Sequence, residues 1–302
     1  MAESSGSLKT ILFALGANVS IAIVKAGAAY VTGSGAMFAE AIHSFADSGN
    51  QGLLLLGMKK ARKPPSMEFP LGHGKELYFW SFVVALILFS LGGLVSFYEG
   101  LHKLQHPEPL NLPEVAIGVL IFSVFAEGTA MSTCLRQVNK LRGGNSLWHW
   151  FRNTRRSELL VIFGEDLAAL LGLTIALVAV TATLITGDPV YDALGTCAIG
   201  MLLVVVAFLI GREVKDLLVG QGVEAPVRQE MVHFLEQQEE VTRVFNMVTL
   251  QMGADVMVAV KAELASAAAP TVASTMINAV EKRFREQYPQ VAWLFFEPDV
   301  ED

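Results

Sequence analysis

Long apolar stretches without a charge constrain this chain more than any other feature. Three of them have about the 20 residues that an α-helix needs to cross the hydrocarbon core of a bilayer: Leu77–Phe97, Leu167–Gly187 and Ala193–Gly211. Because lipid cannot satisfy free backbone N–H and C=O groups, such stretches span a membrane as helices. The sequence therefore predicts an α-helical membrane protein.

Three further stretches have similar length and composition apart from one or a few ionisable residues. They are Ile11–Tyr30, which contains Lys25; Ala36–Met58, which contains Glu40, His43 and Asp47; and Val115–Leu135, which contains Glu127. Gly and Pro mark most of the breaks between stretches, and the two long breaks are Lys59–Gly74 and Arg136–Arg156. We therefore predict six transmembrane helices.

The overall composition excludes several other classes of protein. Of the 302 residues, 53% are hydrophobic and 17% are charged, whereas an ordinary soluble domain has about 25% charged residues. This balance argues against a soluble globule, a disordered chain and a nucleic-acid binder. Cys134 and Cys197 both lie in apolar stretches, so we expect packing residues rather than a disulfide framework.

Acidic charge is concentrated at the end of the chain. Residues 221–302 contain six Lys and Arg against 13 Asp and Glu, whereas the first 220 residues contain 16 of each kind. We therefore predict a six-helix transmembrane domain over residues 1–219 and a soluble acidic domain over residues 220–302.

The acidic domain has the pattern of a small α+β fold. Helices are predicted over residues 224–238 and 270–288, and strands rich in Val, Met and Phe over residues 241–251, 255–264 and 291–297. The order is αββαβ. About 80 residues are enough for one hydrophobic core.

Lys and Arg fall on alternate loops. The breaks after the second and fourth predicted helices and the segment after the sixth are basic, while the other short loops contain only Lys103. Since short cytoplasmic loops carry the excess of Lys and Arg, both termini are predicted to be cytoplasmic, or on the equivalent side of an organelle.

Ionisable side chains inside the second predicted helix are candidates for function, because each costs at least about 2.5–3.5 kcal/mol at bilayer depth. His43 and Asp47 are four residues apart and so share one helix face. An imidazole and a carboxylate so placed can bind one metal ion. Glu40 lies one turn before His43, displaced around the helix, and can instead lie near the membrane surface.

The fourth and fifth predicted helices add further carboxylates. Glu127 lies in the fourth, and Glu165 and Asp166 are adjacent in the fifth. Neighbouring residues on a helix point about 100° apart, so these two need not face the same pocket. Glu127 and Glu165 can alternatively pair with a basic residue or lie near an interface. Lys25 is expected to snorkel or to neutralise a carboxylate.

Two sequence motifs, one in the second predicted helix and one in the loop that follows it, resemble those of one family. Residues 39–48 read AEAIHSFADS, and residues 69–76 in the following loop read FPLGHGKE. With six spans, cytoplasmic termini and an αββαβ tail, they resemble the cation diffusion facilitator family of divalent metal transporters from about residue 8 to 298. HSFADSGNQ at 43–51 and GEDLAA at 164–169 are similar to the branch that includes the animal mitochondrial zinc transporter.

This resemblance implies a homodimer that exchanges a divalent cation for protons. It also implies a transport site made of two residues on the second helix and two on the fifth, each pair four residues apart. His43, Asp47 and Asp166 match three of these positions, but the fourth is Ile162. The chain therefore departs from the usual four-ligand site.

Another ligand is then expected in place of Ile162, either Glu165 or Glu127. Glu127 is preferred, because a residue beside Asp166 should point away from its face. Two other metal sites of the family are not expected in full. The loop motif keeps only His73, and the soluble domain has a single histidine, His233. We expect this domain to act mainly in dimerisation.

One imidazole with two or three carboxylates suits Zn²⁺, and also Mn²⁺, Fe²⁺, Co²⁺, Ni²⁺ or Cd²⁺. Because the ligands must be deprotonated, binding the metal releases protons. The sequence thus predicts a proton-coupled exporter of divalent metal, zinc in the first place, with no permanent cofactor. Its partners are metal cations, protons, the lipid bilayer and a second copy of the chain.

Two alternatives stay open at this point. One is a transport-inactive membrane metal sensor or dimeric scaffold, because the fourth ligand is missing. The other is an intramembrane metalloenzyme, which the lack of an HExxH motif disfavours. The acidic start MAESS does not resemble a transit peptide, so we expect a bacterial inner (plasma) membrane rather than an organelle.

Overall fold

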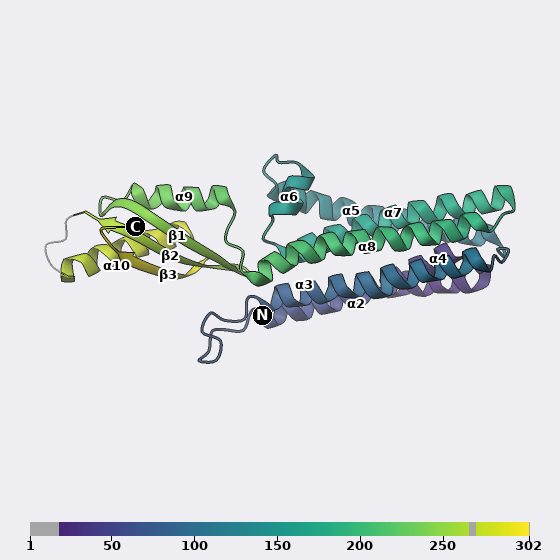
Figure 1. Ribbon diagram of the computed structural model, residues 1–302, viewed down its shortest axis with the longest axis horizontal. Coiled ribbons are helices and arrows are strands. Elements are labelled where there is room, and N and C mark those ends of the chain that lie inside the picture. Colours follow the sequence, from purple (N-terminus) through teal and green to yellow (C-terminus); the bar gives the residue numbers. More distant parts are fainter. Residues whose placement is uncertain (1–17, 266–269, 302) are drawn as a thin grey trace, which may run out of the picture. The chain divides into compact units, whose positions relative to one another are not determined.

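The computed structural model describes residues 18–265 and 270–301. The chain divides into two compact units (Figure 1). The first comprises Met1–Leu56, Trp80–Trp150 and Ser157–Glu213 and contains helices, while the second comprises Gly57–Phe79, Phe151–Arg156 and Val214–Asp302 and contains the sheet.

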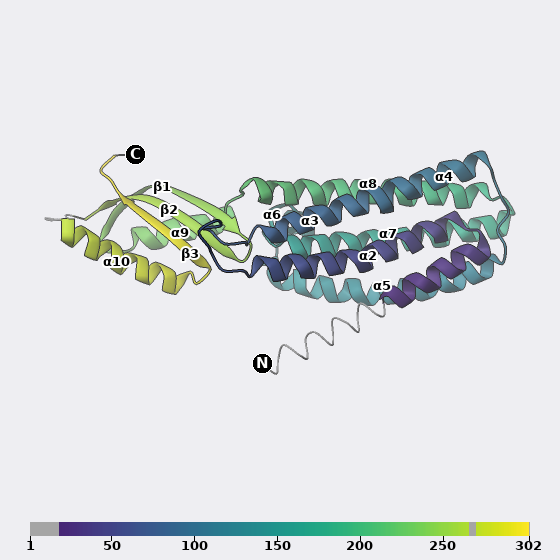
Figure 2. The same ribbon diagram turned by 90° about the horizontal axis from the view of Figure 1, so that it is seen from below.

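Long helices account for most of the first unit and lie roughly parallel to one another (Figure 2). After a helix over Asn18–Thr32, the chain forms α2 (Gly35–Ala61), α3 (Glu76–Ile87), η1 (Leu88–Leu94), α4 (Val95–Gln105), α5 (Pro113–Leu141), α6 (Leu147–Asn153), α7 (Ser157–Thr186) and α8 (Val190–Val219). Among the described residues, four stretches are long and apolar enough to cross a membrane: Glu76–Gln105, which joins α3, η1 and α4, and the helices α5, α7 and α8. The protein is therefore a helical membrane protein.

These four stretches correspond to the predicted third to sixth spans. The predicted second span lies in α2, a continuous helix of 27 residues that also carries Glu40 and Asp47. The predicted first span, Ile11–Tyr30, begins outside the described residues, and its described part belongs to the helix Asn18–Thr32. The number of six spans accordingly stays a prediction.

The predicted break Arg136–Arg156 was too wide. Helix α5 continues to Leu141, and the short helix α6 occupies much of the remainder. The extension of α5 has a physical reason, since Val138 is buried and Lys140 lies in the last turn, where a cation interacts favourably with the helix dipole. Similarly α7 begins at Ser157, so Glu165 and Asp166 lie well inside a helix.

The start of α2 is held in place by a carboxylate from α8. Ser34 Oγ and the backbone N–H groups of Gly35 and Ala36 donate to Asp192, at 2.6, 2.7 and 3.3 Å. Asp192 is buried and also lies 3.7 Å from Lys103 Nζ. The free N–H groups of the first turn of α2 are thereby satisfied from a distant helix. This contact fixes where along the bundle the ionisable residues of α2 lie.

Glycines bring the Glu76–Gln105 helix close to α8. A Cβ atom on Gly93 would lie 2.7 Å from Val204 Cγ2, and one on Gly100 would lie 2.5 Å from Cys197 Sγ. Small residues allow two membrane helices to approach closely and gain van der Waals contact. Cys197 packs in this interface, and Cys134 is buried elsewhere in the first unit.

The acidic part of the chain folds in the predicted order αββαβ. The elements are α9 (Ala225–Glu236), β1 (Val241–Met252), β2 (Asp255–Leu264), α10 (Pro270–Gln287) and β3 (Val291–Pro298). The central strand β2 pairs antiparallel with β1 and parallel with β3. The tight turn between β1 and β2 uses Gly253, whose φ is +74°.

Alternation along β2 separates the two faces of this sheet. Val256, Val258, Val260 and Ala262 point to one face and pack against buried side chains of α9 and α10, namely Met231, Leu235, Val280 and Phe284. Both helices lie on this face (Figure 2). The small α+β domain therefore has one core, as predicted, and a second sheet face that neither α9 nor α10 covers.

Candidate functional site

Helix α2 carries a line of polar side chains at four-residue spacing. His43, Asp47 and Gln51 follow one another along one face, as the helical repeat requires. His43 Nε2 lies 3.3 Å from Asp47 Oδ2. The side chain of His43 is 1% exposed and that of Asp47 is 17% exposed, so the line runs from the packed interior to an accessible space.

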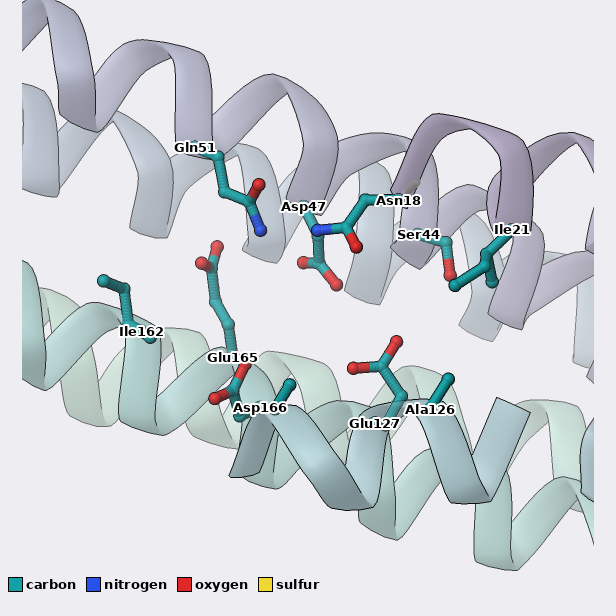
Figure 3. A pocket seen from close by; sticks show the side chains of 11 residues that line it. Asn18, Ile21, Ser44, Asp47, Gln51, Ala126, Glu127, Ile162, Glu165 and Asp166 are labelled. Atoms are coloured by element: carbon teal, nitrogen blue, oxygen red, sulfur yellow. The ribbon is translucent and has the colours of Figure 1, made fainter. Parts of the chain in front are cut away.

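That space is a cavity between α2, α5, α7 and the helix Asn18–Thr32 (Figure 3). Its walls combine carboxylates, neutral polar groups and a few small or branched apolar side chains. The lining residues are Asn18, Ile21, Ser44, Asp47, Gln51, Ala126, Glu127, Ala130, Ile162, Glu165 and Asp166.

Four of the predicted site residues meet at this cavity. They are Asp47 from α2, Glu127 from α5, and Glu165 and Asp166 from α7. The expectation that Glu165 would face away from the side of Asp166 is wrong, because both side chains line the same cavity. Ile162 also lines it, so the position without a ligand adjoins the same space but offers no donor atom.

His43 is close to the site but does not line the cavity. Neither of its ring nitrogens, nor Asp47 Oδ1, has a hydrogen-bond partner among the described residues. Buried polar atoms are usually satisfied, and those that are not call for an explanation such as an ion or a water molecule. These atoms are the ones that a bound cation would satisfy.

Glu165 is anchored across the helix interface. Asn50 Nδ2 on α2 donates to Glu165 Oε1 on α7 at 2.6 Å. Asn50 is fully buried and Glu165 is 5% exposed. The two helices that carry Asp47 and Asp166 are thus joined by a hydrogen bond to a carboxylate, which is stronger than one between neutral groups.

Lys25 forms a buried ion pair behind the cavity wall. Its Nζ lies 3.3 Å from Glu40 Oε2 and donates to Ser44 Oγ at 2.8 Å. Lys25 and Glu40 are both fully buried. The prediction that Lys25 neutralises a carboxylate is confirmed. Glu40 does not line the cavity, and its side chain is buried inside the first unit.

Carboxylates together with a nearby imidazole match the ligands that divalent first-row metals accept. Among the described residues, no three His, Cys, Asp or Glu side chains lie close enough to share one ion. Long acidic side chains would have to turn toward one another to surround a metal. Glu127 and Glu165 have the reach for this, since both project into the cavity from opposite Asp47 (Figure 3).

The comparison with known proteins decides the family. A family model for the cation efflux transmembrane domain matches residues 11–219. The chain belongs to the cation diffusion facilitator family. Members of this cation efflux family are transporters rather than enzymes, so the metalloenzyme alternative is set aside.

Several relatives place this cation diffusion facilitator near one branch. It is 36% identical to the mouse mitochondrial proton-coupled zinc antiporter SLC30A9 over 228 residues, which cover 74% of this chain and 40% of the mouse protein. It is 28% identical to metal tolerance protein C4 of Arabidopsis thaliana over 242 residues, or 80% of this chain and 53% of that protein. The magnetosome protein MamM of Magnetospirillum gryphiswaldense is 30% identical over 118 residues, or 37% of each chain.

This cation diffusion facilitator spans about two fifths of the length of the antiporters that it matches. The resemblance to the branch with the animal mitochondrial zinc transporter, first seen in residues 43–51 and 164–169, is confirmed by these relatives.

Sequence reasoning missed three polar lining residues, Asn18, Ser44 and Gln51, and the role of Asn50. Gln51 could have been found, because it extends the four-residue spacing of His43 and Asp47 by one more turn. The others depend on helix packing. Outside the cavity, His73 lies against Phe69 with ring centroids 4.4 Å apart, and His233 Nε2 contacts Gln237 Nε2 at 2.9 Å.

Proposed function

We propose that this protein exports a divalent metal cation, zinc in the first place, from the cytoplasm in exchange for protons. The observation that carries the proposal is the cavity between α2, α5 and α7, which gathers Asp47, Glu127, Glu165 and Asp166 beside His43. The names of the SLC30A9 relatives as proton-coupled zinc antiporters support zinc and protons as the exchanged ions.

Exchange follows from the chemistry of these ligands. A metal ion binds ionised carboxylates and neutral imidazole, so its arrival displaces protons and the return of protons expels it. A cavity that opens alternately to the two sides of the membrane would therefore move metal one way and protons the other. The proposed ligands are His43, Asp47 and Asp166, with Glu127 and Glu165 as the candidates for the fourth position.

The proposal includes a topology. We take Asn18–Thr32 and α2 as two further spans, which makes six, and the basic loops as cytoplasmic together with both termini. Residues 1–219 then form the transport domain and residues 220–302 the cytoplasmic domain. The matched SLC30A9 proteins are named mitochondrial. From the sequence, we propose a bacterial inner membrane for this protein.

We also propose that the protein is a homodimer joined in part by the sheet. The face away from α9 and α10 carries an apolar row across all three strands: Val248, Leu250, Met257, Ala259, Trp293 and Phe295. Val248 and Phe295 are 53% and 55% exposed. Apolar patches of this kind on a soluble surface mark interaction sites, and a second copy offers the matching face.

Metal uptake into proteoliposomes with an imposed pH gradient tests the function. Zn²⁺, Mn²⁺, Fe²⁺, Co²⁺, Ni²⁺ and Cd²⁺ are compared in parallel, with an internal pH dye to follow protons. We expect zinc flux with opposite proton movement in the wild type. Folded protein that moves none of the six metals would contradict the proposal and favour a transport-inactive sensor or scaffold.

A further inference from the structure

Ile162 leaves one side of the cavity without a donor atom, and Glu165 is the nearest acidic neighbour on the same helix. Both residues line the cavity, one turn apart on α7. Figure 3 shows the side chain of Glu165 extending from α7 toward α2, where it approaches Gln51 and Asp47. A carboxylate from position 165 can therefore serve the space beside Ile162.

Asn50 determines where this carboxylate lies. It is fully buried, does not line the cavity, and donates from Nδ2 to Glu165 Oε1 at 2.6 Å. Its own Oδ1 has no hydrogen-bond partner among the described residues. Burying an unsatisfied amide oxygen costs about 1–3 kcal/mol. Stability alone gives no reason to keep an amide here, whereas orientation of Glu165 does.

Glu127 lacks this support. It is only partly buried, and no described residue donates a hydrogen bond to it. A ligand whose rotamer is fixed by a buried neighbour is already oriented for the metal, while one that moves freely must be ordered on binding. The geometry therefore favours Glu165 over Glu127 for the fourth position.

We propose that Glu165 is a ligand of the transported metal and that Asn50 is the positioning residue that holds it. In this arrangement Oε1 stays with Asn50 and Oε2 is left for the cation. The proposal rests on the proposed transport function and deepens it. It also means that α2 and α7, which carry Asp47 and Asp166, are tied together by the same carboxylate that binds the metal.

The test exchanges the two side chains. Glu165→Gln removes the charged ligand, Asn50→Asp removes the donor without changing volume, and the double variant restores a hydrogen bond with its direction reversed. Thr183→Val is the matched control, because Thr183 is a buried polar residue of α7 that bonds only to Ala179 O among the described contacts. Zn²⁺ binding to purified full-length protein is measured by calorimetry, zinc flux in proteoliposomes, and thermal unfolding in detergent.

We expect each single variant to raise the dissociation constant for Zn²⁺ at least about tenfold, the range found when groups that orient metal ligands are removed. The double variant should recover thermal stability but not zinc binding, since its carboxylate lies at position 50, outside the cavity. Thr183→Val should bind zinc as the wild type does.

Two results would overturn the assignment. One is a double variant that binds zinc as tightly as the wild type, which would make the pair a structural contact only. The other is a Glu165→Gln variant with unchanged affinity. Wild-type protein that binds zinc but moves none in proteoliposomes would instead contradict the proposed transport and leave the roles of Glu165 and Asn50 to the binding data.

Discussion

Asp47 and Asp166 approach one cavity from two different helices, α2 and α7. As proposed ligands of the transported metal, they are expected to be required for flux and dispensable for folding. We predict that Asp47→Ala and Asp166→Ala each abolish zinc flux in proteoliposomes while the protein elutes as the wild type does in size-exclusion chromatography. Glu114→Ala, at an exposed position in the first turn of α5, should transport normally. Flux retained in either Asp variant would remove that residue from the site.

Lys25 and Glu40 illustrate the opposite case, a buried pair whose loss should unfold the protein. Removing one partner of a buried ion pair leaves an uncompensated charge and typically costs about 3–5 kcal/mol. We predict that Lys25→Met lowers the unfolding temperature strongly and that Lys25→Met with Glu40→Gln regains most of it, because the double variant has no unpaired charge. Thermal unfolding in detergent measures both. Equal losses in the single and double variants would mean that an unpaired charge on Glu40 is not the cause of the destabilisation.

At the scale of elements, the position of α2 depends on Asp192 of α8. Loss of a side chain that caps a helix costs about 0.5–2 kcal/mol, and three donors at the start of α2 lose their acceptor together when Asp192 is removed. We predict that Asp192→Ala lowers both the unfolding temperature and zinc flux, since the face of α2 that carries the proposed ligands loses its anchor. Asp216→Ala, which removes an exposed carboxylate of α8, is the control and should change neither. Unchanged flux in Asp192→Ala would show that packing alone positions α2.

A second contact between elements ties α10 to the start of β1 and depends on pH. Arg283 Nη2 donates to Glu240 Oε2 at 2.6 Å, and this hydrogen bond lowers the pKa of Glu240 below its usual 4.5. The folded state therefore holds the ionised form more strongly, so the stabilisation is present above pH 4.5 and is lost as pH falls below the lowered pKa. Because Arg283 is 40% exposed, we expect less than about 1 kcal/mol.

Arg283→Gln tests this pH dependence. At pH 7 the variant should unfold at a slightly lower temperature than the wild type, and this difference should shrink as the pH falls below 4.5. A difference that stays constant over this range would assign the effect to the hydrogen bond from Arg283 Nε to Gln238 Oε1, which does not titrate.

At the scale of the whole molecule, the open sheet face is expected to bring two copies together. We predict that Phe295→Lys, at the β3 edge of the apolar row, shifts the detergent-solubilised protein from dimer to monomer in light scattering coupled to chromatography. A buried Lys without a partner is costly in such an interface. Val300→Lys is the control, because Val300 is 78% exposed and lies beyond β3. A Phe295→Lys variant that remains dimeric would place the interface elsewhere.

Much of this architecture could be predicted from periodicity alone. The spans from Leu77 onward and the αββαβ domain follow from local patterns, because a helix in lipid needs an apolar stretch and a half-buried strand alternates. The candidate residues of α2 followed from the same local rule, four residues to one helix face. Helix ends were less predictable, since charged residues near Leu141 continue α5 rather than end it.

What sequence alone determined, then, is which ionisable residues lie inside the apolar helices and which helix face each occupies, because the cost of charge in lipid and the helical repeat act within one segment. Only the tertiary structure decided which of them meet. In the structure, Glu165 lines the cavity beside Asp166, whereas His43 contacts Asp47 but does not line the cavity. Lys25 forms an ion pair with Glu40, and Asn50 donates a hydrogen bond to Glu165. These partnerships depend on the approach and rotation of neighbouring helices, which packing between distant segments sets and no single segment encodes.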